Sequence, residues 1–420
     1  LENDVIFSHK ITLDVTHRQR EYFSRAAGCD RFCWNLCLAE WNRRHESGEK
    51  RSGAAIKKDF NTFKYEAFPW MDGLHRDAHA DAFERVGDAW SRYFKALKIG
   101  NKTTGRPKFH KKGRRESFYV SNDRLNFSKD GFRVKLPVIG EVGMRERLRY
   151  QGKIIGATVL RIADRWFINI RVDVVKVRKK DEWVDIEKRR TGNGIIGVDV
   201  GLQTAAVVSG GTEFQAPKPL KKALKKLRRL QRKASRQIKG GKNQKKTYRR
   251  VANVHARCEN VRKDHWDKIT TKLCSENQAV GIETLNVKGM LKNRKLARAL
   301  SDAAFGEFAR QMAYKAIIFD VKLVKADRWY PSSKTCSKCG HVKETLSLAE
   351  RVFHCDHCGL EIDRDLNAAI NLMKLAMAEV EKSKLPTACG EVKPAKEERL
   401  VKALGAAGTK PIAHSCALTN

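Results

Sequence analysis

Three acidic residues stand in parts of the sequence that otherwise predict buried elements. Asp199 lies in the apolar run IIGVDVG, Glu283 ends the run AVGIE, and Asp365 opens the helical pattern DLNAAINL. A carboxylate in such a place is costly unless it is paired or binds a metal. Any one of them alone fits an ordinary strand end or helix N-cap. The three together, in this order and in a strongly basic chain, predict a pair of Mg²⁺ ions that clamps the attacking and leaving oxygens of a phosphodiester.

A group of cysteines has the spacing of zinc ligands. The pattern C-x2-C-x15-C-x2-C is made by Cys336, Cys339, Cys355 and Cys358. Four thiolates suit tetrahedral Zn²⁺ and leave no open position, which predicts a structural ion in a segment too short to build its own core. A glycine follows each pair and allows the tight turn that brings both thiolates to one ion. His354 and His357 are expected to be neighbours of the ligands and not ligands.

Three other cysteines, Cys29, Cys33 and Cys37, lie four residues apart on one predicted helix face. One helix face supplies too few convergent ligands for a metal, so buried free thiols are expected. No run approaches ~18 apolar residues, and the first ten residues lack a charged-then-apolar signal pattern. These features predict an intracellular protein without a membrane segment, whose 11 cysteines are thiols or metal ligands.

The charge of the chain points to its partner. The 420 residues include 86 Lys and Arg against 48 Asp and Glu, a formal net charge of +38. Hydrophobic residues make up 41%, which is enough for folded cores and excludes a wholly disordered basic protein. Such an excess on a folded chain predicts a polyanionic partner, and nucleic acid fits best. Charge alone does not separate an enzyme from a scaffold that only neutralises phosphates.

The densest basic segment, residues 218–250, holds 16 Lys and Arg and no acid. Its apolar residues recur at spacings of three and four and predict an amphipathic helix that ends at Gly240-Gly241. This stripe is Leu220, Leu224, Leu227, Leu230, Ala234 and Ile238. A second helix is expected from about Gln244 towards Ile269. Because no acid compensates the charge, the first helix is expected to contact a phosphate backbone. Its contact residues would be Lys221, Lys225, Arg228, Arg229, Arg232 and Arg236. Those of the basic loop GRPKFHKK (105–112) would be Arg106, Lys108, Lys111 and Lys112.

The elements around these groups can be outlined from periodicity. A first strand is expected near residues 5–15, and Thr16 with Gln19 resembles a capping box that opens a helical unit over 16–98. Alternation over 106–176 predicts an antiparallel barrel or sheet, with a hairpin turn at 163–165. The helical unit therefore looks inserted between two parts of one β domain. A charged linker is expected from Lys176 to Arg190, and a hairpin is expected to carry Asp199 on its first strand.

These motifs together resemble the TnpB family, the transposon-encoded relatives of type V CRISPR effectors. The matching segments are GVDVG (197–201), GIETLNV (281–287), YPSSKTCSKCG (330–340), CDHCG (355–359), DRDLNAAINL (363–372) and GRPKFHKK (105–112). The resemblance covers most of residues 5–378 and is most specific in the second half. By motif it gives the catalytic and Mg²⁺-binding roles to Asp199, Glu283 and Asp365. Asp363 is the weaker candidate for the third carboxylate.

The resemblance implies a multidomain α+β fold: a β-barrel wedge domain with an inserted helical recognition domain, then an RNase H-like RuvC nuclease domain with an inserted zinc-binding module. The expected boundaries are 1–15 and 105–187 for the wedge domain, 16–104 for the recognition domain, 191–330 for the RuvC domain with a basic helical insertion at 216–270, 331–360 for the zinc-binding module, 361–378 for the last RuvC segment and 379–420 for a flexible tail.

The implied activity is Mg²⁺-dependent, RNA-guided cleavage of DNA. A guide RNA from the transposon end would pair with one strand of a double-stranded target, while the protein holds the heteroduplex by shape and charge and reads a short motif beside the target. A heteroduplex of ~20 base pairs would account for the charge excess. The protein is expected to act as a monomer in a ribonucleoprotein, in the prokaryotic cytoplasm and at the nucleoid when bound to DNA.

Three alternatives remain open from the sequence. A compact type V CRISPR effector would have the same fold, and only the genomic context would separate it. An RNA-guided DNA-binding repressor would lack one or more of the three acids, and all three are present. A transposase-type protein that cuts and joins strands without a guide would use similar acids. Co-purification with a defined RNA would discriminate between the last of these and a guided nuclease.

Overall fold

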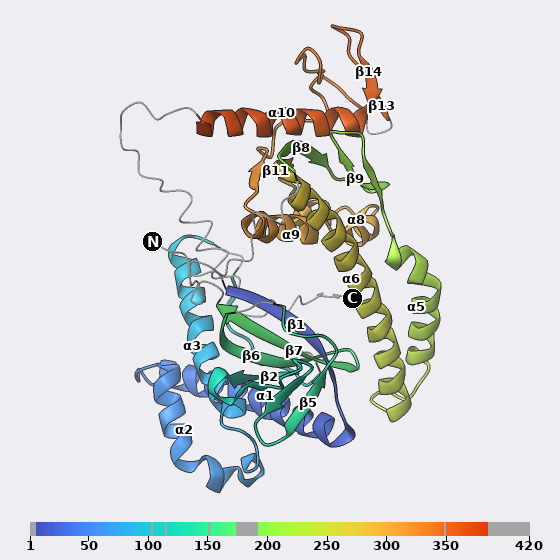
Figure 1. Cartoon of the computed structure of the whole chain (residues 1–420). Helices are drawn as coiled ribbons and strands as arrows, with labels where there is room; N and C mark the ends of the chain where they lie inside the picture. The colour runs from blue at the N-terminus through green and yellow to red at the C-terminus, as the bar shows by residue number, and fades with distance from the viewer. Residues whose placement is uncertain are drawn as a thin grey trace, which may run out of the picture. The chain divides into compact units, whose positions relative to one another are not determined.

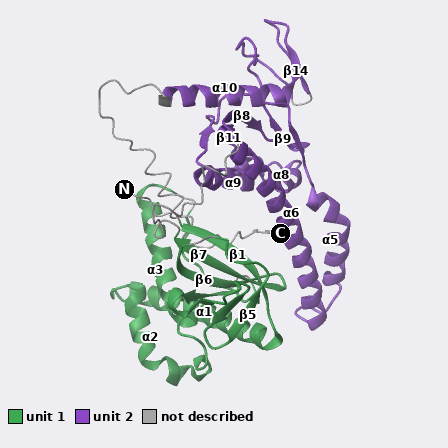
Figure 2. Cartoon of the chain, viewed as in Figure 1, with its two compact units in different colours: residues 1–181, 393–420 green, residues 182–392 purple. Residues whose placement is uncertain are grey.

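The computed structural model describes residues 6–101, 104–113, 116–149, 152–173, 192–347 and 350–384 (Figure 1). The chain divides into two compact units (Figure 2). Unit 1 comprises residues 1–181 with 393–420, and unit 2 comprises residues 182–392. The predicted linker Lys176–Arg190 lies outside the described residues.

Unit 1 is built on a seven-stranded sheet in the order β2-β6-β7-β1-β5-β4-β3, and every neighbouring pair is antiparallel. The strands are β1 (Ile6–Asp14), β2 (Ser117–Ser121), β3 (Asn126–Phe127), β4 (Arg133–Leu136), β5 (Gly140–Met144), β6 (Lys153–Ile162) and β7 (Arg165–Asp173). The predicted antiparallel sheet and its hairpin between β6 and β7 are confirmed. The first strand pairs with β7 and β5 in the middle of the sheet, so the helices between β1 and β2 are an insertion into one β structure.

Three helices fill that insertion: α1 (His17–Glu46), α2 (Gly53–Ala67) and α3 (Asp77–Lys98), with the short turn η1 (Pro69–Met71) before α3. A second short turn, η2 (Asn122–Arg124), follows β2. The capping box of Thr16 and Gln19 is present at the start of α1, as predicted. Phe23 of α1 is fully buried against the rings of Phe118 and Trp166 in the sheet, with ring centroids 5.5 and 5.3 Å away. This aromatic contact fixes the helices on the sheet.

The predicted thiol row of α1 faces the core of unit 1. Cys29, Cys33 and Cys37 are all buried and free of disulfides, which confirms that expectation. Bonding to Cys29 and burial raise the pKa of Cys33 far above its ordinary value, so this thiol stays protonated.

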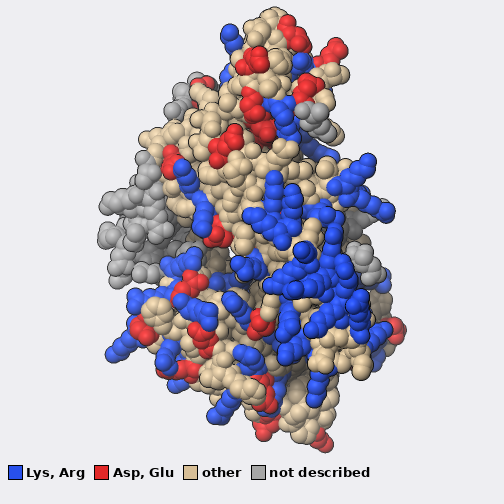
Figure 3. Space-filling model, turned by 90° about the vertical axis from the view of Figure 1, so that its right-hand side faces the viewer, with Lys and Arg blue, Asp and Glu red and all other residues tan. Residues whose placement is uncertain are grey.

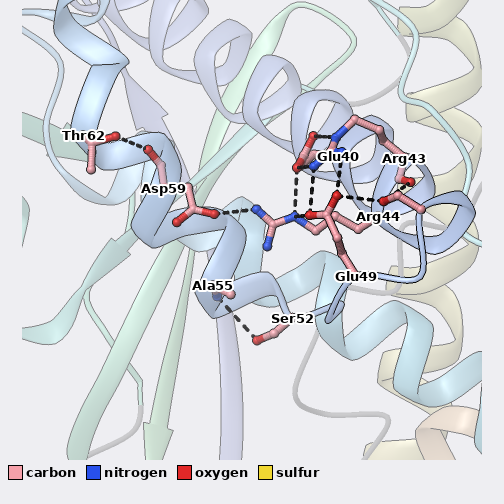
Figure 4. Close-up of polar contacts among 9 residues, drawn as sticks. Glu40, Arg43, Arg44, Glu49, Ser52, Ala55, Asp59 and Thr62 are labelled. Atoms are coloured by element: carbon pink, nitrogen blue, oxygen red, sulfur yellow. Dashed lines mark hydrogen bonds and ion pairs between the residues drawn. The ribbon is translucent and has the colours of Figure 1, made fainter.

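The end of α1 is tied to α2 by a network of charged side chains (Figure 4). Glu40 accepts hydrogen bonds from Arg43 and Arg44, and the Arg44 guanidinium lies 2.5 Å from Asp59 of α2. The bonds from Arg43 lower the pKa of Glu40 to about 2. Ser52 caps α2 by accepting from the Ala55 amide. These charge-assisted contacts hold the turn between the two helices.

Unit 2 contains a five-stranded sheet in the order β10-β9-β8-β11-β12. Its strands are β8 (Gly194–Asp199), β9 (Thr204–Val208), β10 (Glu213–Gln215), β11 (Asn277–Ile282) and β12 (Lys322–Lys325). The first three form antiparallel neighbours, as the predicted hairpin at Asp199 requires, while β8, β11 and β12 run parallel. A parallel sheet needs cover on both faces. In Figure 1, α10 (Arg364–Lys384) lies on one face and α6 (Lys242–Glu276) and α9 (Phe305–Ile318) lie on the other.

The remaining elements of unit 2 are the helices α5 (Pro219–Ser235), α7 (Val287–Met290) and α8 (Ala297–Ala303) and the strand pair β13 (Val352–His354) and β14 (Glu361–Asp363). The break between two basic helices at Gly240-Gly241 is confirmed by the gap between α5 and α6.

The structure corrects one sequence expectation in unit 2 and places two expected domain boundaries within helices. Ile238 does not continue the apolar stripe, because α5 ends at Ser235 and the Ile238 side chain is 86% exposed. The expected end of the basic insertion at residue 270 falls within α6, which runs to Glu276 and buries Trp266 and Ile269 in the core beneath the sheet. The expected boundary between the last RuvC segment (361–378) and the tail falls within α10, which runs to Lys384; the rest of the predicted tail lies outside the described residues.

Candidate active site and metal centre

Two of the predicted acids lie side by side at one edge of the unit 2 sheet. In the parallel pair of β8 and β11, Val198 lies opposite Ile282. The next residues are Asp199, which ends β8, and Glu283, which directly follows β11, and both are half-buried. Neighbouring strands lie about 4.8 Å apart, so the two carboxylates leave the carboxyl ends of adjacent strands as close neighbours.

Helix α10 brings the third acid to the same edge. Asp365 lies in its first turn. The helix lies directly on the sheet because two strand positions have no side chain. A Cβ atom at Gly197 would lie 1.9 Å from the Ala369 carbonyl oxygen, and one at Gly281 would lie 2.2 Å from the Leu372 carbonyl oxygen. Both glycines therefore permit an approach of helix to strand that no other residue allows.

The three carboxylates interact electrostatically. Burial, followed by the charges of Glu283 and Asp365, raises the pKa of Asp199 well above its ordinary value, and nearby Arg364 opposes this only in part. Glu283 accepts a 2.5 Å hydrogen bond from the Ser332 hydroxyl. Three acids so placed cannot all ionise at little cost unless a cation joins them. A donor set made only of carboxylate oxygens is the kind that Mg²⁺ takes.

Asp363 has a different position from Asp365. It is exposed, ends β14, and accepts the backbone N–H of Leu366 at 2.9 Å, as an N-cap does. Asp365 is half-buried, and its carboxylate lies 3.5 Å from Arg364 and 3.9 Å from Arg351. The capping bond gives Asp363 a structural role at the helix start.

The four predicted zinc ligands come together in the described part of unit 2. The Sγ atoms of Cys336, Cys339, Cys355 and Cys358 all lie within 4.8 Å of one another. The pairs Cys336–Cys358 and Cys339–Cys355 are 3.6 Å apart, close to the ~3.8 Å that a tetrahedron with 2.3 Å Zn–S bonds requires. Gly340 and Gly359 adopt φ of 78° and 68°, so each turn needs its glycine, as expected. His354 and His357 are exposed and lie outside the cluster.

Two asparagines whose role was not predicted from the sequence connect the cysteine cluster to the acidic edge. Asn367 of α10 donates to the Thr335 carbonyl at 2.7 Å and accepts from the Ser337 amide at 2.9 Å. Asn371, one turn later, donates to the carbonyl oxygens of Ser332 and Thr335. Both side chains are buried. Two amides four residues apart in an apolar helix were a readable signal for a buried polar contact.

The basic helices expose the predicted cationic side chains. Figure 3 shows a broad patch of Lys and Arg side chains on the face of unit 2 that α5 and α6 form. All six predicted contact residues, five on α5 and Arg236 directly after it, are exposed, whereas Leu227, Leu230 and Ala234 are buried. Since the apolar stripe faces inward, the charges of α5 face solvent.

Buried Asp302 of α8 fixes the start of α5. Its carboxylate accepts the backbone N–H groups of Leu220 and Lys221 at 2.9 and 3.0 Å and pairs with Arg262 of α6 at 3.0 Å. A carboxylate at a helix N-terminus accepts hydrogen bonds from N–H groups that have no partner within the helix. Its negative charge also interacts favourably with the positive end of the helix dipole. Nothing in the local sequence around Asp302 signals this contact, which depends on a residue 82 positions away.

The basic loop of unit 1 is held rigidly against α1. Trp34 donates from its indole nitrogen to the Lys108 carbonyl at 3.0 Å, and its ring stacks on His110 with centroids 4.3 Å apart. Asn35 exchanges two hydrogen bonds with the backbone of His110. The side chains of Arg106, Lys108, Lys111 and Lys112 are exposed. These contacts from Trp34 and Asn35 involve the backbone of the loop, so the four charged side chains remain exposed.

The described residues include no helix that is long and apolar enough to cross a membrane.

Three family profiles match the chain. Residues 170–294 match the family described as "Probable transposase" (OrfB_IS605), residues 305–372 match the Cas12f1-like TNB domain, and residues 5–50 match a helix-turn-helix domain. In the described part of residues 5–50 the structure contains strand β1 and one helix, α1.

Named relatives cover most of the chain. A protein of Streptomyces pristinaespiralis with the name "Putative RNA-guided DNA endonuclease" is 32% identical over 396 residues, which is 91% of this chain and 90% of the relative. The protein InsQ of Escherichia coli K12, named in the same way, is 26% identical over 89% of this chain and 92% of its own length. A CRISPR-associated endodeoxyribonuclease Cas12f1 of Sulfoacidibacillus thermotolerans is 23% identical over half of each chain.

Similarity to solved structures is lower. The mini-RNA-guided endonuclease CRISPR-Cas_phi3 has a TM-score of 0.44 at 10% identity, over 89% of this chain and 92% of that one. A Cas12f1 complex with sgRNA and target DNA has a TM-score of 0.33 at 16% identity, over 88% and 99%.

Proposed function

The chain belongs to the TnpB family, and from this premise we propose that it is an RNA-guided DNA endonuclease whose catalytic centre is the acidic edge of the unit 2 sheet. The observation that carries the proposal is the meeting of Asp199, Glu283 and Asp365 at the carboxyl ends of two parallel strands and the start of one helix. Its relatives' names supply the substrate class, DNA, and the guide, RNA.

Within this proposal, unit 2 is an RNase H-like RuvC domain. The antiparallel β10-β9-β8 run followed by parallel β11 and β12, with helices on both faces, supports the assignment. Residues 191–330 with 361–384 make up the domain and 331–360 its zinc module. Residues 1–15 and 105–187 make up the wedge domain, whose described strands all lie in unit 1, and the helical recognition domain over 16–104 interrupts it. The position of α1, α2 and α3 between strands β1 and β2 of one sheet supports this division.

Asp199, Glu283 and Asp365 would hold Mg²⁺. The ion supplies charge neutralisation at the phosphodiester and a lowered pKa for an attacking water when it is bound. The chain's own residues have separate tasks. Ser332 orients Glu283 through its hydroxyl, and Arg364 and Arg351 lie beside Asp365, where they limit the charge repulsion that burial intensifies. Gly197 and Gly281 let α10 hold Asp365 at the strands.

The zinc cluster is proposed to be structural. Its four thiolates leave no position for substrate, and Asn367 and Asn371 join its first cysteine turn to the helix that carries Asp365. Zinc binding would therefore stabilise the segment that contains Ser332 and so the acidic edge as well.

The exposed charges are proposed to bind the nucleic acids. Phosphates of guide RNA, heteroduplex or target DNA would be contacted by two groups of side chains, with one protein chain in each ribonucleoprotein. The first group lies on α5 and at its C-cap: Lys221, Lys225, Arg228, Arg229, Arg232 and Arg236. The second lies on the basic loop: Arg106, Lys108, Lys111 and Lys112.

The test is guided cleavage by the purified protein. Its co-purified RNA is sequenced first, and the guide segment of that RNA is then replaced by a new sequence. The ribonucleoprotein should cut a double-stranded target that matches the new guide, only with Mg²⁺ present. Asp199→Ala should abolish cutting and leave RNA and target binding within about twofold, because the side chain contributes to chemistry and not to the guide channel. Gel-shift titrations measure binding.

Two results would contradict the proposal. Cutting at a fixed site without RNA would favour the guide-independent transposase. Mg²⁺-dependent cutting by the Asp199→Ala protein would remove the acidic edge as the catalytic centre.

A further inference from the structure

An exposed tryptophan stands beside the proposed catalytic centre. Trp329 is 79% exposed, the highest fraction among the large aromatic side chains of the described residues. Single exposed apolar residues are common and need no explanation. The surroundings of Trp329 are what set it apart, because its loop is fastened at both ends to the strand that carries Glu283.

The loop over residues 327–331 begins and ends at the catalytic strand. On its N-terminal side, Ala326 donates its amide to the Ile282 carbonyl at 2.8 Å, and the Ala326 carbonyl accepts from the Thr284 hydroxyl at 2.7 Å. On its C-terminal side, Ser332 donates to the Glu283 carboxylate. Trp329 is three residues from either end. An extended chain spans at most about 3.3–3.6 Å per residue, so three residues span at most roughly 11 Å. The Trp329 Cα therefore lies within roughly 11 Å of the Cα atoms of Ala326 and Ser332, which bond to residues 282–284.

The loop is also ordered within itself. Asp327 accepts the Trp329 amide on its carboxylate at 2.8 Å and the Tyr330 amide on its carbonyl at 3.1 Å. The Tyr330 hydroxyl reaches the Asn371 carbonyl of α10 at 3.5 Å. The position of the Trp329 backbone is therefore fixed by bonds that do not involve its ring, and the ring remains available to a partner.

The charge next to the ring suits an anionic partner. The Arg328 guanidinium lies over the Trp329 ring at 4.9 Å, and Lys325, also exposed, ends the preceding strand. No other aromatic ring in the part of the chain that the structure describes pairs with Trp329. A flat ring with a guanidinium beside it is the combination that binds an unpaired nucleotide, in which the base stacks and the phosphate meets the cation.

We propose that Trp329 is a positioning residue that stacks on an unpaired base of the DNA strand entering the acidic edge, with Arg328 contacting the adjoining phosphate. The proposal rests on the proposed nuclease function. A stacked base a short distance from the carboxylates would hold the scissile phosphate in register with Asp199, Glu283 and Asp365. Stacking is tolerant of base identity, so this contact would position the strand without adding sequence preference.

The first arm of the test measures cutting. Ribonucleoproteins with Trp329→Ala, Trp329→Phe and the unaltered chain are compared in single-turnover cleavage of a guided target. The Ala variant should cut about 5- to 150-fold more slowly, from the range for base–aromatic stacking, while target affinity stays within about twofold. Trp329→Phe should recover most of the rate because it keeps a stacking ring. The matched control, Ile317→Ala, truncates an exposed apolar side chain of α9 in the same unit and should cut normally.

The second arm does not depend on cutting. Single-stranded DNA with 2-aminopurine at successive positions is bound to the ribonucleoprotein carrying Asp199→Asn. Fluorescence should be quenched at one position or a few adjacent positions, and Trp329→Ala should abolish that quenching. If the unaltered protein does not cut, the nuclease proposal fails, yet this arm still decides whether the ring stacks on a base.

Three results would overturn the proposal. One is an Ala variant with unchanged cleavage and unchanged quenching. Another is a Phe variant as slow as the Ala variant, which would assign another role to the indole. The third is loss of zinc or of thermal stability in Trp329→Ala, which would make the residue structural.

Discussion

Replacing Gly197 by alanine should disable the acidic edge without altering any carboxylate. The added methyl group would lie 1.9 Å from the Ala369 carbonyl oxygen and 2.3 Å from the Met373 amide nitrogen. Both atoms belong to the backbone of α10, so no side-chain rotation relieves the contact. Either the helix or strand β8 must move.

The size of the movement follows from the contact. Ordinary contacts of a Cβ begin near 3.4 Å, so the helix must retreat by about 1.5 Å. Asp365 is one turn before Ala369 on the same helix and must move with it. A displacement of about 1 Å at a catalytic site costs on the order of 100-fold in rate, so single-turnover cleavage should fall at least that far. The free energy of unfolding should fall by about 1–3 kcal/mol, the usual cost of overpacking.

The assay is guided cleavage under single-turnover conditions, with RNA affinity, zinc content and urea unfolding measured on the same preparation. Gly210→Ala is the matched control, since a Cβ there meets no atom within 4 Å and the residue does not require positive φ. It should leave all four measurements unchanged. Gly281→Ala should behave like Gly197→Ala, because its Cβ would meet the Leu372 carbonyl at 2.2 Å.

A folded Gly197→Ala protein that cuts within about threefold of the unaltered chain would refute this reasoning, since the stated displacement predicts a far larger loss. Loss of zinc and RNA binding together with cleavage would also count against it. That outcome would mean general unfolding and not a local shift of Asp365.

Four further predictions concern single features. Burial and the neighbouring acids raise the pKa of metal-free Asp199, so folding takes up a proton and stability should decline as pH rises above its ordinary pKa of ~4. Asp199→Asn should reduce this decline and raise Tm at pH 7 in buffer without Mg²⁺ and without a chelator, measured by calorimetry against the unaltered chain. Cys336→Ser should lose the bound zinc, assayed by elemental analysis, whereas His357→Ala should retain it, because His357 lies outside the cluster. Alanine at all six named α5 cations should lower the slope of log affinity for RNA against log salt by up to ~4, and an unchanged slope would place RNA elsewhere. Asp302→Ala should lower the free energy of unfolding by ~2–4 kcal/mol in urea titrations, because it removes the α5 cap and leaves Arg262 without its buried partner; Asp264→Ala, an exposed acid on α6, should cost less than ~0.5 kcal/mol.

Much of the site could be predicted because its signals are local. A cysteine pair followed by glycine defines a metal turn within five residues, and an apolar run with one acid defines a strand end. The capping box at Thr16 and the helix break at Gly240-Gly241 are likewise set by neighbours in the chain. The prediction for Ile238 failed because the apolar spacing in the sequence continues beyond the end of the helix. The spacing that includes Ile238 continues after α5 has ended, and the period of α6 does not tell a solvated turn from one buried under a sheet.

The residue types of the acidic edge and the zinc cluster were thus determined by the sequence alone, because each depends on short spacing and on the cost of placing a charge or thiol in an apolar run. Only the tertiary structure decided how they meet. The parallel register of β8 with β11, the approach of α10 over Gly197 and Gly281, the asparagine contacts to residues 332–337 and the cap of α5 by Asp302 all join segments that are 30 or more residues apart. Contacts of that range depend on how packed surfaces fit, and a one-dimensional pattern does not contain this information.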